Sequence, residues 1–260
     1  MTLNREQMLI EMGIRPLWAW RESCPVQPEA ALEAVSDPPD APVPASASAA
    51  VAAATAPAVP SVSSPPIETL NWSDLPPAVQ ACRACGLHQR RQHAVAGMGD
   101  AQAEWLFISD APGHEEDARG EPFAGVAGEL FDAMLAALDL GREHQVFVTL
   151  AVKCRTPDNR PPEGAEIAAC RPWLQRQIAL LQPKIIVALG KSAALSLLGR
   201  SEKLADLRGQ ALEYEGIPVV VSYHPSYLLR NLPDKAKTWE DLLRARQLWR
   251  AGVLRKPAQL

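Results

Sequence analysis

The stretch from 109 to 128, SDAPGHEEDARGEPFAGVAG, combines five acidic side chains with four glycines. It follows a strand-like apolar run (105–109) and precedes a pattern typical of an amphipathic helix (127–139). Asp110, at the end of the strand, would project into a cleft, and glycines permit a ligand to approach closely. Phe123 could offer a flat face to a planar ligand. The same acids could instead be solvated or cap helices, and they would repel a pyrophosphate.

Two further segments, KCRTPDNRPP (153–162) and YHPSYLLRNLPDK (223–235), place basic side chains beside prolines and aromatic residues. His224 is held rigidly between a strand end and a proline, although a lone histidine in such a place is more often a cap than a ligand. Basic groups next to aromatic rings on several loops suit a phosphate backbone that delivers one unstacked base. These loops favour contact with nucleic acid through a local patch.

The cysteines form a second candidate site. Cys82 and Cys85 make a C-x-x-C pair, Cys154 closes a strand, Cys170 lies within a helix pattern, and Cys24 stands apart. Four thiolates could hold zinc or a [4Fe–4S] cluster, which tolerates the wide spacing of the second pair. A redox dithiol and plain buried thiols are the other interpretations. Spacing alone leaves zinc and a cluster about equally favoured.

Alternating strands and helices must position these groups. Apolar strand-like runs occur at 105–109, 145–152, 184–190 and 218–224, and helix-like runs lie at 127–139, 164–181, 191–198 and 236–251. Short apolar strands separated by helices predict an α/β fold with a three-layer α/β/α arrangement around a central, mostly parallel sheet. The segments that carry the acidic, basic and histidine side chains described above begin at the carboxyl ends of strands, where such folds bind ligands.

Composition divides the 260 residues, whose net charge is −4, into three parts. Residues 1–24 include an amphipathic segment (3–20) that could bind a protein partner, and 25–68 form a Pro/Ala-rich linker expected to be disordered. The folded domain is expected at 69–254. The first 68 residues carry three basic and eight acidic side chains, giving −5, and the remainder carry 23 and 22, giving +1. No domain-wide basic field is present, and neither a membrane span nor a signal peptide is expected, which favours a cytoplasmic protein.

The region from about 75 to 250 resembles the family 4 uracil-DNA glycosylases. The resemblance rests on CRACGLHQRR, DAPGHEEDARGEPFAGVAGELFDAML, VKCRTPDNRPPEGAEIAACRPWL, IIVALGKSAA and YHPSYLLR, which occur in the family's order. It implies the uracil-DNA glycosylase fold, base flipping from DNA in base excision repair, and a monomer associated with the nucleoid. It also implies that the four cysteines at 82, 85, 154 and 170 hold a structural [4Fe–4S] cluster.

The resemblance further implies a role for each site residue. A carboxylate at Asp110 or Glu116 would stabilise the cationic sugar or orient water, and His224 would face uracil O2 as the base departs. The flipped base would contact Ala111, stack on Phe123 and meet position 150. Phosphate contacts are expected from four residues, namely Arg155, Arg160, Ser226 and Arg230.

Two positions depart from the family pattern. Ser109-Asp110 stands where the family usually has Gly-Glu, and Asp retracts the carboxylate by one methylene. Leu150 stands where an Asn normally reads the uracil edge, and Leu can neither donate nor accept a hydrogen bond. The leading hypothesis is a uracil-DNA glycosylase with weakened or altered specificity. The alternatives are a degenerate member that acts as a DNA- or protein-binding scaffold and, resting on the cysteines only, a zinc or redox protein.

Overall fold

The computed structural model describes residues 66–255. The expected partner-binding segment, almost all of the expected linker, and Cys24 lie outside the described residues. Within 66–255, no helix is both long enough and apolar enough to span a membrane.

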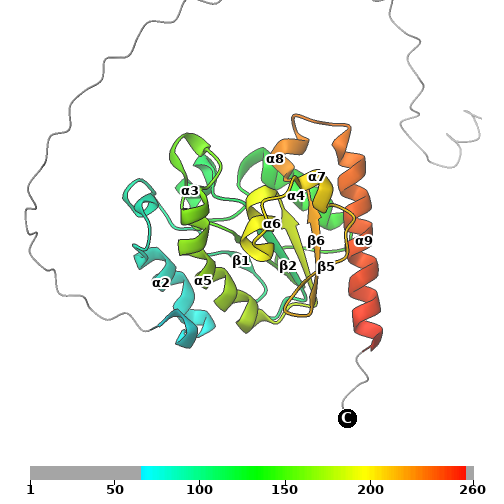
Figure 1. Ribbon diagram of the computed structural model, residues 1–260, viewed down its shortest axis with the longest axis horizontal. Coiled ribbons are helices and arrows are strands. Elements are labelled where there is room, and N and C mark those ends of the chain that lie inside the picture. The colour runs from blue at the N-terminus through cyan, green and yellow to red at the C-terminus, as the bar shows by residue number, and fades with distance from the viewer. Residues whose placement is uncertain (1–65, 256–260) are drawn as a thin grey trace, which may run out of the picture. The chain divides into compact units, whose positions relative to one another are not determined.

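A six-stranded sheet forms the centre of the described region (Figure 1). Its order is β1-β3-β2-β4-β6-β5, with β3, β2, β4 and β6 parallel and the two edge strands antiparallel to their neighbours. The strands are β1 (Met98–Gly99), β2 (Trp105–Ser109), β3 (Val146–Leu150), β4 (Ile185–Leu189), β5 (Leu212–Tyr214) and β6 (Ile217–Ser222). Every residue of β2, β3 and β4 is buried, as expected for parallel strands covered on both faces.

Helices cover both faces of the sheet, so the predicted three-layer α/β/α fold is confirmed. One face packs against α5 (Gly164–Leu181), α6 (Lys191–Leu198) and α7 (Leu204–Leu207). The other packs against α4 (Gly125–Ala136) and α9 (Asp234–Arg255), where Phe131 and Leu242 join the core. Shorter elements complete the chain: α2 (Leu75–Ala81), α3 (His114–Arg119), α8 (Pro225–Leu228) and the 3-10 turns η1 (Ile67–Thr69), η2 (Trp72–Asp74), η3 (Gly86–Gln89) and η4 (Pro157–Asn159).

The four predicted strands and four predicted helices are all present, with bounds that shift by a few residues. The edge strands β1 and β5 and the short helices α2, α3, α7 and α8 were not predicted. The two-residue β1 and three-residue β5 are too short to produce an apolar run, and they exist because a neighbouring strand supplies their hydrogen bonds. The helix α3 is built from HEEDAR, which contains no apolar stripe.

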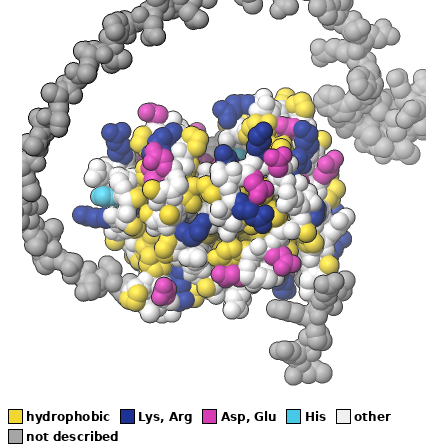
Figure 2. Space-filling view, viewed as in Figure 1, with side chains coloured by type: hydrophobic (Ala, Val, Ile, Leu, Met, Phe, Trp, Pro, Cys, Tyr) yellow, Lys and Arg dark blue, Asp and Glu magenta, His cyan; other side chains and the backbone are white. Residues whose placement is uncertain are grey.

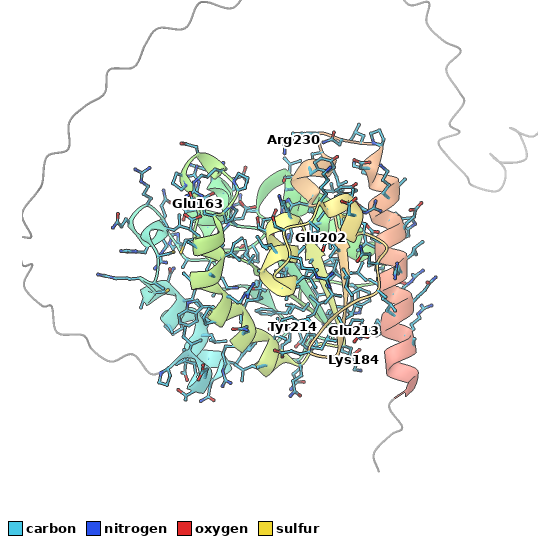
Figure 3. All side chains as sticks on the ribbon, viewed as in Figure 1. Glu163, Lys184, Glu202, Glu213, Tyr214 and Arg230 are labelled. Carbon is cyan, nitrogen blue, oxygen red and sulfur yellow. The ribbon has the colours of Figure 1, made fainter. Side chains whose placement is uncertain are left out.

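The two ends of the sheet carry different groups. Arg230 and Glu163 lie at the end where the parallel strands finish, and Lys184, Glu213 and Tyr214 lie at the opposite end (Figure 3). Basic and acidic side chains are interspersed on the face seen in Figure 2, in agreement with the net charge of the domain. The face seen in Figure 2 is therefore not dominated by one sign of charge.

Candidate functional site

A cleft of about 990 Å³ opens at the carboxyl ends of the parallel strands. Nine of the ten non-cysteine site residues expected from the sequence line it: Asp110, Ala111, Glu116, Phe123, Leu150, Arg160, His224, Ser226 and Arg230. Arg155 is not among the lining residues, and its Nε donates to Asn159 Oδ1 at 2.8 Å. Tertiary structure thus brings segments more than 100 residues apart to one concave surface.

His224 has a defined tautomer in this cleft. The backbone N–H of Ser226 donates to its Nδ1 at 3.2 Å, and the Ser226 hydroxyl lies 2.8 Å from the same nitrogen. Because Nδ1 accepts from the Ser226 N–H, Nε2 carries the proton, and Nε2 lies 2.8 Å from Ser109 Oγ. Burial lowers the pKa of His224 from 6.5 to about 4, so the imidazole is neutral at pH 7. The ring presents one N–H donor without a full positive charge.

Phe123 adopts a strained backbone conformation beside His224. Its φ of 54° lies in the left-handed region, which is rare for a bulky side chain. The ring stacks with His224 at a centroid distance of 5.3 Å and with Phe131 at 4.2 Å, and Phe123 is only 4% exposed. Gly128 permits this turn, since a Cβ there would lie 2.0 Å from the Phe123 carbonyl oxygen.

Arg142, which the sequence did not single out, holds the strained turn in place. Its guanidinium donates to the carbonyl oxygens of Pro122 at 2.8 Å and Phe123 at 2.9 Å. It also pairs with Asp132 at 2.5 Å and lies over the ring of Phe131, 5.5 Å from the centroid. Arg142 follows Phe123 by 19 residues and belongs to no motif, so only the packing of α4 reveals this role.

The Asp110 carboxylate is turned toward the first residues of α6. Its Oδ1 accepts a hydrogen bond from Ala193 N at 2.8 Å, and Gly190 permits the approach because a Cβ there would lie 2.3 Å from Oδ2. Burial raises the pKa of Asp110 from 3.8 to about 6, against the opposing effect of hydrogen bonds from Ala193 and Ser192. Asp110 is therefore a fixed carboxyl group at the cleft wall whose pKa lies well above that of an ordinary aspartate.

Two further acids of the turn, Glu116 and Asp117, also support local structure. Glu116 lines the cleft and accepts from the backbone N–H of Gly113 at 3.0 Å, which caps α3. Asp117 is buried and accepts from the backbone N–H groups of Gln92 and His93 at 2.9 and 3.2 Å. Part of the negative charge in this stretch therefore caps a helix and ties down a loop.

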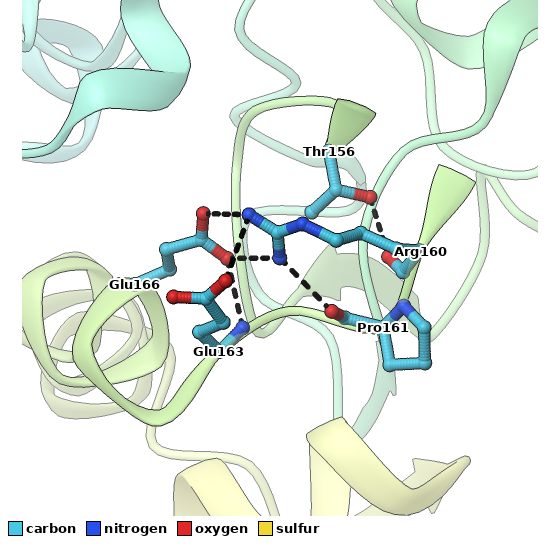
Figure 4. A network of polar contacts seen from close by, with 5 residues as sticks. All are labelled: Thr156, Arg160, Pro161, Glu163 and Glu166. Atoms are coloured by element: carbon cyan, nitrogen blue, oxygen red, sulfur yellow. Dashed lines mark hydrogen bonds and ion pairs between the residues drawn. The ribbon is translucent and has the colours of Figure 1, made fainter. Parts of the chain in front are cut away.

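Arg160 is held by acidic neighbours at the cleft rim (Figure 4). Two guanidinium nitrogens donate to Glu166 at 2.7 and 2.9 Å, and a third contact joins Glu163 at 3.3 Å. This bidentate pair fixes the 156–163 loop at the start of α5. Arg230, in contrast, is exposed on the segment between α8 and α9.

The four cysteines expected to bind a metal centre line one cavity, beside Arg91, Lys153 and Trp173. None of these thiols forms a disulfide. Arg91 Nη1 donates to Cys154 Sγ at 2.8 Å, and Lys153 N donates to Cys170 Sγ at 3.3 Å. Burial raises the pKa of the Cys170 thiol to about 11, so a metal centre would have to displace its proton.

Lys153 belongs to the 153–162 segment that was expected to expose basic side chains, but it is buried. It is 1% exposed, and its Nζ donates to Leu150 O and to Gln177 Oε1, both at 2.8 Å. Burial lowers its pKa from 10.5 to about 8. This side chain supports the end of β3 between the cysteine cavity and the cleft, where it is not available to a phosphate.

Comparison with known proteins places the chain in one family, since the family model and the similar proteins agree. Residues 96–243 match the model of the uracil DNA glycosylase superfamily. The chain is 38% identical over 174 residues to the type-4 uracil-DNA glycosylase of Pyrobaculum aerophilum, covering 63% of this chain and 87% of the relative. It is 41% identical over 179 residues to that of Sulfurisphaera tokodaii (65% and 81%) and 39% identical over 178 residues to that of Saccharolobus solfataricus (65% and 82%). The chain belongs to the uracil DNA glycosylase superfamily, with type-4 uracil-DNA glycosylases among its relatives.

Proposed function

We propose that this protein is a uracil-DNA glycosylase, a hydrolase that flips uracil out of DNA and cleaves its N-glycosidic bond. The observation that carries the proposal is the neutral His224, whose Nε2–H points into a cleft also lined by Phe123 and Asp110. Three relatives named type-4 uracil-DNA glycosylases support it. An apolar ring, a neutral donor and a carboxylate suit a neutral base attached to a sugar that becomes cationic.

In the proposed reaction, the bond between C1′ and N1 breaks and its electron pair leaves with the base, where charge gathers on O2. His224 Nε2–H donates to O2, and water supplies the oxygen that bonds to C1′. Asp110 or Glu116 orients that water and takes its proton. Ala111 and Leu150 border the base. Because Phe123 is 4% exposed and stacks with both Phe131 and His224, only a small part of its ring is open to the base.

We propose that Cys82, Cys85, Cys154 and Cys170 hold a [4Fe–4S] cluster. All four thiols line a single cavity, and a [4Fe–4S] cluster needs one thiolate at each of its four irons. The N–H donors from Arg91 and Lys153 to cysteine sulfurs are of the kind that tune such a centre. The cluster's contribution would be structural: it would fasten the 82–85 segment to the end of β3 and to α5.

We propose that Arg155, Arg160, Ser226 and Arg230 contact DNA phosphates around the cleft. Phosphate contacts position the strand and leave the choice of base to the cleft floor. Arg230 is the best placed, since it is exposed at the rim, whereas Arg160 would have to share its guanidinium with Glu166. Leu150 is the residue that favours the alternative function, a DNA-binding scaffold without catalysis, because a family member with an apolar base pocket could bind DNA without cleaving it.

A direct assay separates the enzyme from the scaffold. Full-length protein is incubated with single- and double-stranded DNA containing one uracil, and the abasic product is cleaved and quantified. We expect product formation with uracil and none with the thymine-containing strand. DNA binding without product at high enzyme concentration would favour the scaffold and contradict the glycosylase.

The pH dependence should report the Asp110 carboxylate. With a pKa of about 6, Asp110 is ionised above that pH and protonated below it. We therefore expect kcat/KM to fall as the pH decreases through 6, approaching tenfold per unit, because the protonated acid neither orients water nor stabilises a cation. Measuring kcat/KM from about pH 4.5 to 8.5 tests this. Asp110→Asn should be slow at all pH values, and its kcat/KM should not fall as the pH decreases through 6. The same fall in this variant would show that another group, and not Asp110, causes it.

Leu150→Asn should increase uracil excision. The amide would offer a donor and an acceptor at the floor of the cleft, where a matched hydrogen bond contributes roughly 1–3 kcal/mol, or about 5- to 150-fold in rate. Leu150→Ala is the matched control, because it removes bulk without adding an amide. Single-turnover rates on uracil-DNA distinguish the two variants. Equal gains in both would show that space, and not hydrogen bonding, limits the wild-type enzyme.

A further inference from the structure

The floor of the cleft contains a pair of residues that meet across two strands. Ser109 ends β2 and Leu150 ends β3, and their Cα atoms are partners in the parallel register. Both line the cleft, and they are 3% and 1% exposed. Side chains alternate along a strand, so Ser109 shares the face of Phe107, which belongs to the same buried cluster as Phe123. Asp110 points to the opposite face, toward α6.

The Ser109 hydroxyl is the polar group of this pair. It lies 2.8 Å from His224 Nε2, which carries the imidazole proton because Nδ1 accepts from Ser226. Ser109 Oγ therefore accepts that hydrogen bond. A hydroxyl can donate its own proton at the same time, so Ser109 retains one donor for a ligand.

We propose that Ser109 is a second hydrogen-bond donor to the departing base, acting beside His224; this inference rests on the proposed glycosylase function. When the base enters, its O2 takes the place of Ser109 Oγ as the acceptor of the Nε2–H. The hydroxyl is then free to rotate and donate to the same oxygen. The β2 side of the floor thereby supplies a polar contact that Leu150, directly opposite on β3, lacks.

A residue that donates a hydrogen bond to the leaving base affects the rates for different bases unequally, whereas a residue that only packs against the base does not. Its contribution grows with the charge that the base carries in the transition state, so it matters less for a base that leaves more easily. The fluorine of 5-fluorouracil stabilises the departing anion. A substitution that removes a donor should therefore slow the release of uracil more than the release of 5-fluorouracil.

The experiment compares single-turnover release of uracil and 5-fluorouracil from otherwise identical DNA. Ser109→Ala should slow uracil release about 10-fold, the loss of one hydrogen bond, and slow 5-fluorouracil release less. Ser109→Thr keeps the hydroxyl and should recover most of the rate. Ser196→Ala, which removes a buried hydroxyl bonded to Ala193 O and outside the cleft lining, is the matched control and should leave both rates unchanged.

The outcomes separate the two proposals. Wild-type activity with an unaffected Ser109→Ala variant would overturn the role of Ser109 and leave the glycosylase proposal standing. Equal slowing on both substrates with a lower Tm would reduce Ser109 to packing and would likewise overturn the inference. A wild-type protein that releases neither base would overturn the glycosylase proposal, and the role of Ser109 with it.

Discussion

His224→Ala should reduce the single-turnover rate of uracil release by about 100- to 1000-fold, the range found when one preorganised oxyanion donor is removed. The size of the effect follows from the fixed geometry of the ring. Ser226 occupies Nδ1 and leaves Nε2–H as the donor, and the depressed pKa of His224, about 4, keeps the ring neutral over the working pH range. A neutral donor that is already oriented requires no reorganisation as charge develops on the base.

His144→Ala is the matched control, because His144 is exposed near the amino end of β3, away from the cleft. It should retain the wild-type rate. His224→Gln gives a second comparison, since it keeps an N–H donor on a flexible chain and should fall between His224→Ala and the wild type. If His224→Ala released uracil at the wild-type rate, another group would have to stabilise the leaving base, and the proposed mechanism would fail.

Cys170→Ala should remove the iron–sulfur centre and destabilise the domain. Three thiolates would remain for four irons, and the fastening between the 82–85 segment, β3 and α5 would be lost. Because metal binding is coupled to folding, we expect a loss on the order of 3 kcal/mol, equivalent to a Tm decrease of roughly 6–12 °C. Iron and sulfide content, visible absorbance and thermal unfolding of anaerobically purified protein measure these changes.

Cys24→Ala controls for the loss of a thiol, because Cys24 stands apart in the sequence and the family resemblance gives it no ligand role. It should retain wild-type iron content and Tm. Full iron content in Cys170→Ala, or stoichiometric zinc without iron in the wild type, would contradict the cluster assignment. The zinc result would return the four cysteines to the alternative that their spacing left open.

The pattern of the sequence was sufficient for the fold. Continuous apolar runs separated by amphipathic segments determine a parallel sheet between two helical layers, because only strands buried on both faces can be apolar throughout. The sequence also predicted the position of the cleft, because the segments that carry the candidate site residues begin at the carboxyl ends of the predicted strands. The short elements were not predicted. The strands β1 and β5 depend on hydrogen bonds from a neighbouring strand, α3 has no apolar stripe, and α2, α7 and α8 have only four to seven residues.

The chemistry of individual side chains depended on tertiary structure. Sequence placed Ser109 and Asp110 side by side, but alternation along β2 directs the first to His224 and the second to α6. The contacts that hold Phe123 come from Arg142, 19 residues further along the chain. The sequence places Lys153 in a basic loop, but in the structure it is buried and donates to the Leu150 carbonyl oxygen at the end of β3.

By itself, the sequence determined the residue types at the cleft, the family to which they belong and the fold that gathers them. Only the tertiary structure decided which face each side chain occupies, which nitrogen of His224 carries the proton, and which acids cap helices. The reason is physical: residue type and periodicity are local properties, whereas burial, pKa and hydrogen-bond partners arise from groups that folding brings together from distant parts of the chain.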